Sequence, residues 1–352
     1  HLIMTGILPT LENNMLTPEN IAPLERYRAM NDQIFAFRGG EPIKLDITGH
    51  EHLETEHNNI LLEAAATAFQ IHLQVPQDKA ARFYNASKIV SAPLIALGAN
   101  SPFLFGKDLW ADTRIPLFEQ SVSLGKWDYA ERVTFGVRYL EDSMFGAFKA
   151  NEQRYPVMMP AEFNSAAKDM SHVKLHNGTI WRWNRPILGK DEDGTPHLRV
   201  EQRVLSSGPT IVDMVANMAF YYGLVHHLVE NEPDIEKQIP FYKARDNFYE
   251  AAQNGLDADV SWHGRATVPV QQLILDELLP KARRGLEELN ISQKDIDKYL
   301  GIIEARAETG QNGAKWQRDF AERTGRNMNK LCIAYLDNQE SGKPVHKWTL
   351  EP

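Results

Sequence analysis

The chain has 352 residues, 43% of them hydrophobic, which is enough to build a large core. Its formal net charge of -9 is spread without long blocks of one sign, which argues against nucleic acid as a partner and against a basic membrane-surface helix. The single cysteine, Cys332, cannot form an internal disulfide, and no stretch approaches the ~20 apolar residues that cross a bilayer. We therefore expect a cytoplasmic protein with a small-molecule partner, built as one domain over residues 1–352.

The first part of the chain is predicted to contain a helix, a strand and a second helix. A helical run within residues 16–37 begins near Pro18. Residues 68–75, AFQIHLQV, alternate strictly between apolar and polar side chains, which predicts a half-buried strand. Residues 80–90 have helical apolar spacing, and Pro93 is expected to limit that helix before a turn at ANSPFLFG.

The middle of the chain predicts two more strands, TIWRWN (179–184) and HLRVEQRVL (197–205), joined by the polar connection LGKDEDGTPH. The remainder is predicted to be largely helical. Helices are expected after the capping residue Thr210, over 240–253, over 268–289, and over 292–308. Strands followed by a helical C-terminal half indicate an α+β fold with antiparallel strands.

Each predicted strand carries one polar face. On residues 197–205 that face places a carboxylate between two guanidiniums, as Arg199, Glu201 and Arg203. The other strands add Gln70, His72 and Gln74, and Arg182 with Asn184. One interpretation is a surface ladder of ion pairs, each worth about 0.2–1 kcal/mol. The other is a cleft for anionic substrates and metal ions, because arginine binds carboxylate or phosphate through two N–H groups and a carboxylate holds Mg²⁺. Taken alone, a histidine such as His72 is more often structural.

The stretch TGHEHLETEHNN (48–59) has the most unusual local composition, with three histidines and three glutamates. It lacks the His-Glu-x-x-His spacing of a zinc site, so we interpret it as a solvated loop that leads into a helix over residues 57–66. Glu51 and His52 are its best candidates for contact with a ligand. The chain also lacks a P-loop, a dinucleotide-binding glycine motif and a Gly-x-Ser-x-Gly elbow.

With these features in view, the chain resembles the glutamate–cysteine ligase family 2, which are carboxylate–amine ligases with a glutamine-synthetase-like fold. The resemblance rests on ordered segments: RYRAM (26–30), TAFQIHLQV (67–75), LGANSPFLFG (97–106), NGTIWRW (177–183), HLRVEQRV (197–204), AAQNGLDA and TGQNGAKWQ. It implies an antiparallel sheet whose polar concave face is backed by helices.

The resemblance also implies a reaction and a site. ATP, with Mg²⁺, would phosphorylate the γ-carboxylate of glutamate to an acyl phosphate, and an amine such as cysteine would displace the phosphate. Glu201 and His72 match metal-site positions, and Arg203 matches a phosphate contact. With these we group Arg199 and Arg182 as catalytic candidates, and His72, Gln70, Gln74 and Asn100 as nucleotide-binding candidates.

One departure from the family pattern stands out. Family members begin with a strand that carries Gly-x-Glu-x-Glu, whose glutamates bind metal, and residues 1–47 contain no such motif. We expect either a longer polypeptide with an earlier segment or the loss of that strand, which would expose a strand edge and favour association of copies. Two alternatives to the ligase remain: a non-catalytic relative that binds nucleotide or amino acid and acts through a partner, and a metal-dependent hydrolase centred on residues 48–59.

Overall fold

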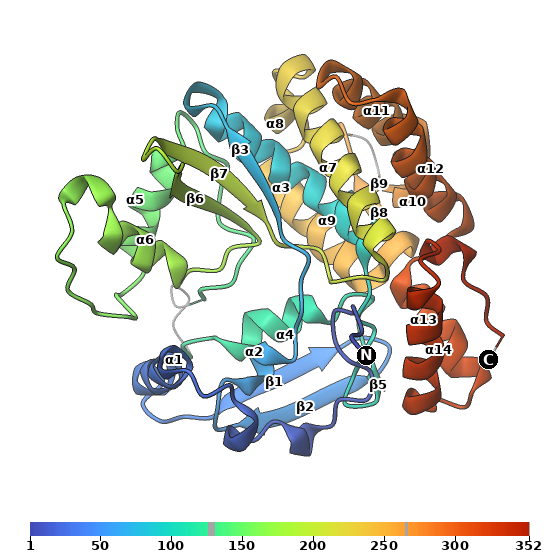
Figure 1. Cartoon of the computed structure of the whole chain (residues 1–352), viewed down its shortest axis with the longest axis horizontal. Coiled ribbons are helices and arrows are strands. Elements are labelled where there is room, and N and C mark those ends of the chain that lie inside the picture. The colour runs from blue at the N-terminus through green and yellow to red at the C-terminus, as the bar shows by residue number, and fades with distance from the viewer. Residues whose placement is uncertain (126–130, 265–266, 352) are drawn as a thin grey trace.

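A three-stranded antiparallel sheet lies beside a helical bundle in this computed structural model, which describes residues 1–125, 131–264 and 267–351 (Figure 1). The sheet has the order β3-β7-β6, with β3 at Ile71–Val75, β7 at Pro196–Gln202 and β6 at Asn184–Lys190. The central strand is β7, and its residue Glu201 is in register with His72 on one side and Arg185 on the other. One face of the sheet packs on helix α3, Ala80–Gly98.

The bundle occupies the second half of the chain and packs α3 at its centre (Figure 1). Its long helices are α7 (Ile211–Asn231), α9 (Phe241–Asn254), α11 (Leu279–Glu288) and α12 (Gln293–Thr309). Shorter elements are α8 (Ile235–Gln238), β8 (Asp259–Ser261), β9 (Thr267–Pro269), α10 (Val270–Leu273) and a π-helical turn at Ile274–Leu278. The described helices include none that is both long and apolar enough to cross a lipid bilayer.

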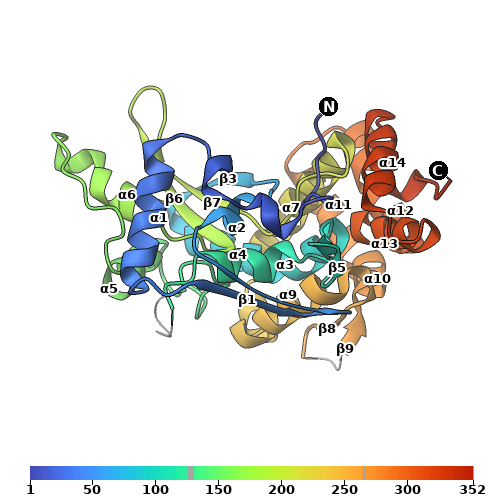
Figure 2. The same cartoon turned by 90° about the horizontal axis from the view of Figure 1, so that it is seen from below.

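The N-terminal part forms a separate hairpin layer below the sheet (Figure 1). Its elements are α1 (Glu25–Phe37), β1 (Ile43–Thr48), β2 (His52–His57), α2 (Leu61–Ala64), the small hairpin β4 (Phe103–Leu104) and β5 (Lys107–Asp108), and α4 (Arg114–Ser121). Figure 2 shows α1 on the side of α5 (Phe145–Arg154) and α6 (Ser171–Gly178), and α13 (Gly313–Arg323) with α14 (Met328–Glu340) at the opposite end.

Local chemistry explains why several predicted elements are confirmed. The side chains of Thr210 and Ser292 each accept a hydrogen bond from a backbone N–H in the first turn of α7 and α12, that of Asp213 and that of Asp295, as N-caps do. In β3 the odd-numbered side chains turn inward and the even-numbered ones are exposed, as the alternation predicts. The mixed composition, with small antiparallel sheets and a helical C-terminal half, confirms the α+β class.

Several boundaries differ from the sequence prediction. Helix α1 begins at Glu25 rather than near Pro18, β7 ends at Gln202 rather than at 205, and three further differences concern the hairpin, α3 and β6. The histidine-rich stretch does not lead into a helix at His57, because residues 52–57 form β2 and pair with β1, whose alternate residues are buried in the core. Helix α3 does not stop at Pro93 but continues to Gly98. A proline inside a helix costs about 3 kcal/mol, and burial of nearly the whole helix offsets that cost.

The third difference concerns the strand predicted at 179–184, which begins at Asn184 and runs on to Lys190. Residues 180–183 lie outside the sheet, where the backbone N–H groups of Trp181 and Trp183 donate to the backbone oxygens of Arg132 and Thr134. The predicted polar connection consequently shrinks to a short turn closed by Asp191 and Thr195.

Candidate active site

Glu201 lies at the centre of the polar face of the sheet. Its side chain is only 2% exposed, and its carboxylate accepts two hydrogen bonds from Arg185, from Nε at 2.5 Å and from Nη2 at 3.1 Å. His72 Nε2 lies 3.7 Å from Glu201 Oε1 on the other side. The strand register causes this meeting, since Glu201 is directly opposite both residues in the antiparallel ladder.

His72 is partly exposed at the open side of this cluster. Burial lowers the pKa of His72, and the nearby Glu201 carboxylate opposes that shift. The neutral imidazole is therefore favoured, which is the form that can bind a metal ion. Gln70 and Gln74 are exposed and alternate with buried positions as His72 does, so the structure places the three predicted side chains along one polar edge.

Arg203 is buried and Arg199 is half-buried, and both bring unused guanidinium donors to the same region. Within the described residues, Nε and Nη1 of Arg203 and Nε of Arg199 are buried and have no hydrogen-bond partner. The Arg203 guanidinium lies 5.4 Å from the centre of the Phe118 ring. Burial lowers the pKa of Arg203 to about 10, so it remains a cation at neutral pH. Because unpaired buried donors are costly, these groups indicate a site for an anion.

Glu63 of α2 is a second carboxyl group in the same electrostatic environment. Burial raises its pKa, and the positive charge of Arg203 acts in the opposite direction. Sequence reasoning missed both Glu63 and Arg185. No local pattern marks Glu63, because it reaches Arg203 only through tertiary packing. Arg185 could have been found by extending the predicted strand by one residue past Asn184.

Two predicted site residues lie elsewhere. Arg182 is buried on the helix side of the sheet, where Nη2 donates to Asn151 Oδ1 at 2.7 Å and its positive charge acts on Lys88 of α3. The amide of Asn100 is committed to an internal network, since Nδ2 donates to the Tyr335 hydroxyl and Oδ1 accepts from Gln317, both at 2.8 Å. The structure therefore does not bring Arg182 or Asn100 together with Glu201.

The histidine-rich stretch is a structural hairpin. His52 pairs with Asp46 at 2.9 Å, and His50 pairs with Asp108 at 3.1 Å. Glu51, one of the two residues predicted to be nearest a ligand, instead binds Arg326 at 2.6 Å and so ties the hairpin to the C-terminal helices. Across residues 1–125, 131–264 and 267–351, no three His, Cys, Asp or Glu side chains converge as metal ligands would.

Comparison with known proteins identifies the family. The family model described as Glutamate-cysteine ligase family 2 (GCS2) matches residues 2–334. A Frankia casuarinae protein with a provisional assignment as glutamate–cysteine ligase 2-1 is 26% identical over 293 residues, which is 79% of this chain and 64% of that protein. The chain thus aligns with less than two thirds of that relative's length.

Proposed function

Because the chain belongs to the glutamate–cysteine ligase family 2, we propose that it uses ATP to join the γ-carboxylate of glutamate to an amine. The observation that carries this proposal is the set of unused, buried guanidinium donors on Arg199 and Arg203 beside the carboxylate of Glu201. Guanidinium N–H groups match the oxygens of phosphate and carboxylate, which are the groups that such a reaction handles.

The donor set on the sheet fits a cation bound with a nucleotide. Glu201 would hold Mg²⁺. His72 Nε2 lies 3.7 Å from the Glu201 carboxylate and would be a second ligand. When bound, Mg²⁺ would neutralise phosphate charge. In the structure the Glu201 carboxylate is ion-paired with Arg185, so the binding of a cation requires Arg185 to move away from it.

The protein's own side chains would bind and orient the reacting groups. Arg203 and Arg199 would hold the phosphoryl oxygens and offset the charge that develops on them, and the burial of Arg203 would strengthen its contact. In the first step a glutamate γ-carboxylate oxygen would attack the terminal phosphorus of ATP and release ADP. In the second step the amine nitrogen would attack the acyl carbon, lose a proton and release phosphate.

Because this chemistry consumes ATP, we place the protein in the cytoplasm.

Purified protein with ATP, Mg²⁺ and glutamate should release phosphate only when a suitable amine is present. A panel of amines that includes cysteine identifies the acceptor, and mass spectrometry of the product distinguishes a γ-glutamyl amide from simple ATP hydrolysis. Release of phosphate without any amide would contradict the proposal.

A second candidate function is a non-catalytic relative that binds nucleotide and acts through a partner. The closed Glu201–Arg185 pair favours it, since an occupied carboxylate is not available to a cation. The same assay separates the two functions. ATP binding by calorimetry without turnover for any amine supports the second function, and turnover with amide formation excludes it.

A further inference from the structure

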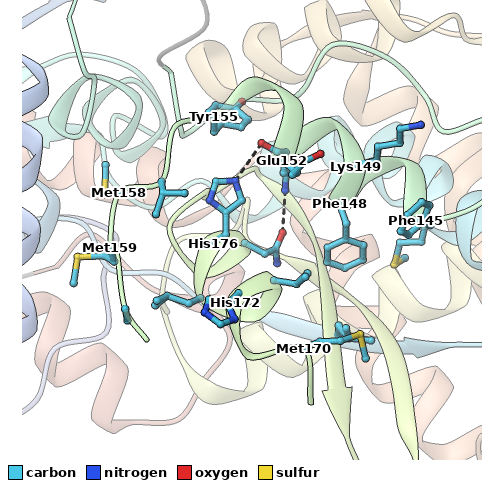
Figure 3. Close-up of a pocket in the computed structure, with 18 of the residues that line it drawn as sticks. Phe145, Phe148, Lys149, Glu152, Tyr155, Met158, Met159, Met170, His172 and His176 are labelled. Carbon is cyan, nitrogen blue, oxygen red and sulfur yellow. Dashed lines mark hydrogen bonds between the residues drawn. The ribbon is translucent and has the colours of Figure 1, made fainter. Parts of the chain in front are cut away.

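A large cavity lies on the helix side of the β6–β7 hairpin, away from Glu201. Its volume is about 1240 Å³, and α5, α6 and residues 155–162 form its walls (Figure 3). Leu188 and Leu198, which are paired across the hairpin, close one side of it. Glu201 and Arg185 are offset from these two by an odd number of positions, so they point to the opposite face of the sheet. The cavity is therefore separate from the candidate active site.

The walls are apolar and adaptable. Figure 3 shows methionine and phenylalanine side chains around the cavity, including Met158, Met159, Met170, Phe145 and Phe148. Methionine has three rotatable bonds and a polarizable sulfur, so it adapts to ligands of different shape. The cavity volume exceeds the ~300–1,000 Å³ typical of small-molecule sites. Such walls suit an alkyl or aryl group.

One residue that lines the cavity, His176, has a buried ring nitrogen to which none of the described residues donates. His176 Nε2 lies 3.2 Å from the backbone oxygen of Asn151, and a carbonyl can only accept, so in the neutral ring Nε2 carries the hydrogen. Nδ1 is then an acceptor, and it is buried without a hydrogen-bond partner among the described residues. The side chain of Asn151 donates to Asn177 and accepts from Arg182, so the residue that the ring contacts is itself held in place. Because His176 lines the cavity, a ligand N–H group that reaches its ring satisfies this acceptor.

The charges at the cavity also favour a cation. The carboxylates of Glu152 and Glu162 and the ammonium of Lys149 all line it, and all three residues are exposed. Two negative charges against one positive charge attract a ligand ammonium group and repel a carboxylate.

From these observations we propose that the cavity binds a primary amine with an apolar body, an alkylamine or arylalkylamine. The apolar body occupies the methionine-lined wall, and the ammonium group donates to His176 Nδ1 near Glu152. The proposal does not depend on the ligase reaction, because the cavity and Glu201 lie on opposite faces of the sheet.

Methionine-methyl NMR tests the proposal directly. Four of the ten methionines line the cavity, Met144, Met158, Met159 and Met170, and the other six serve as internal controls. Titration with hexylamine should shift the four cavity signals and leave the others unchanged. Because each buried methylene is worth about a fourfold change in affinity, hexylamine should bind roughly fifteenfold more tightly than butylamine. Hexanoate and hexan-1-ol of the same length should bind at least about tenfold more weakly than hexylamine.

Two variants with matched controls identify the polar contacts. His176→Leu should weaken hexylamine about tenfold, whereas His50→Leu on the distant hairpin should not. The exposed change Glu152→Gln should weaken hexylamine a few-fold, whereas Glu192→Gln in the β6–β7 turn should not. The proposal is overturned if hexylamine leaves the four cavity methionines unshifted, if hexanoate binds as tightly as hexylamine, or if neither His176→Leu nor Glu152→Gln changes the affinity.

Discussion

Replacing Glu201 by glutamine tests the candidate site most sharply, because one carboxylate serves both an ion pair and the proposed cation site. Arg185 donates to it at 2.5 and 3.1 Å, and it is 2% exposed. Removing one partner of a buried pair costs about 3–5 kcal/mol. Glutamine keeps one acceptor oxygen in place, so we expect the free energy of unfolding to fall by about 2 kcal/mol. A protein with the usual 5–15 kcal/mol of stability would remain folded.

The same change should nearly abolish the reaction. Loss of an anionic ligand weakens cation binding and transition-state stabilisation, so glutamate-dependent phosphate release should fall at least about a hundredfold, roughly 2.7 kcal/mol in barrier. Urea unfolding followed by circular dichroism measures stability, and phosphate release at saturating Mg²⁺ measures activity. Near-normal turnover of Glu201→Gln under these conditions would refute the role of Glu201.

Matched variants separate stability from chemistry. Arg185→Gln removes the same ion pair, so Glu201→Gln and Arg185→Gln should be less than additive in a double-mutant cycle of unfolding free energy. Glu56→Gln breaks a surface pair with Lys44 on the distant hairpin and should change neither property by more than about 0.5 kcal/mol. Additive effects of the first two variants would show that the observed pair does not stabilise the fold.

Three further outcomes follow from the same structure. Arg203→Lys should lower turnover at least about tenfold, since a point charge cannot replace two guanidinium donors, and full activity in the turnover assay would make Arg203 structural. Burial raises the pKa of Glu119 from 4.5 to about 7, so the folded state holds that proton and stability falls as pH rises from about 4.5 to 7. Urea unfolding should show that the free energy of unfolding of the natural protein is roughly 3 kcal/mol lower at pH 8 than at pH 5, and that the Glu119→Gln variant lacks this difference. The same pH dependence in both proteins would contradict the assignment. Replacing His50, His52 and His57 together by alanine should leave turnover within about tenfold, and complete loss in a folded protein would favour a metal centre on the hairpin.

The polar face of the sheet shows which site residues the alternation of the sequence can predict and which it cannot. The alternation in residues 70–75 and 197–203 identified His72, Glu201, Arg199 and Arg203, since side-chain direction in a strand depends only on sequence position. Arg182 was assigned to the same face, but the strand that would have carried it begins two residues later. The position of a strand boundary depends on hydrogen bonds to distant segments, which no local window contains.

The sequence by itself determined the family, the α+β class and the starts of α7 and α12, because capping and periodicity act between residues a few positions apart. Only the tertiary structure decided that Arg185 closes on Glu201, that Glu63 lies within the field of Arg203, and that α3 continues through Pro93. Each of these depends on strand register or on burial against segments far along the chain, where the free energy of packing outweighs local preference.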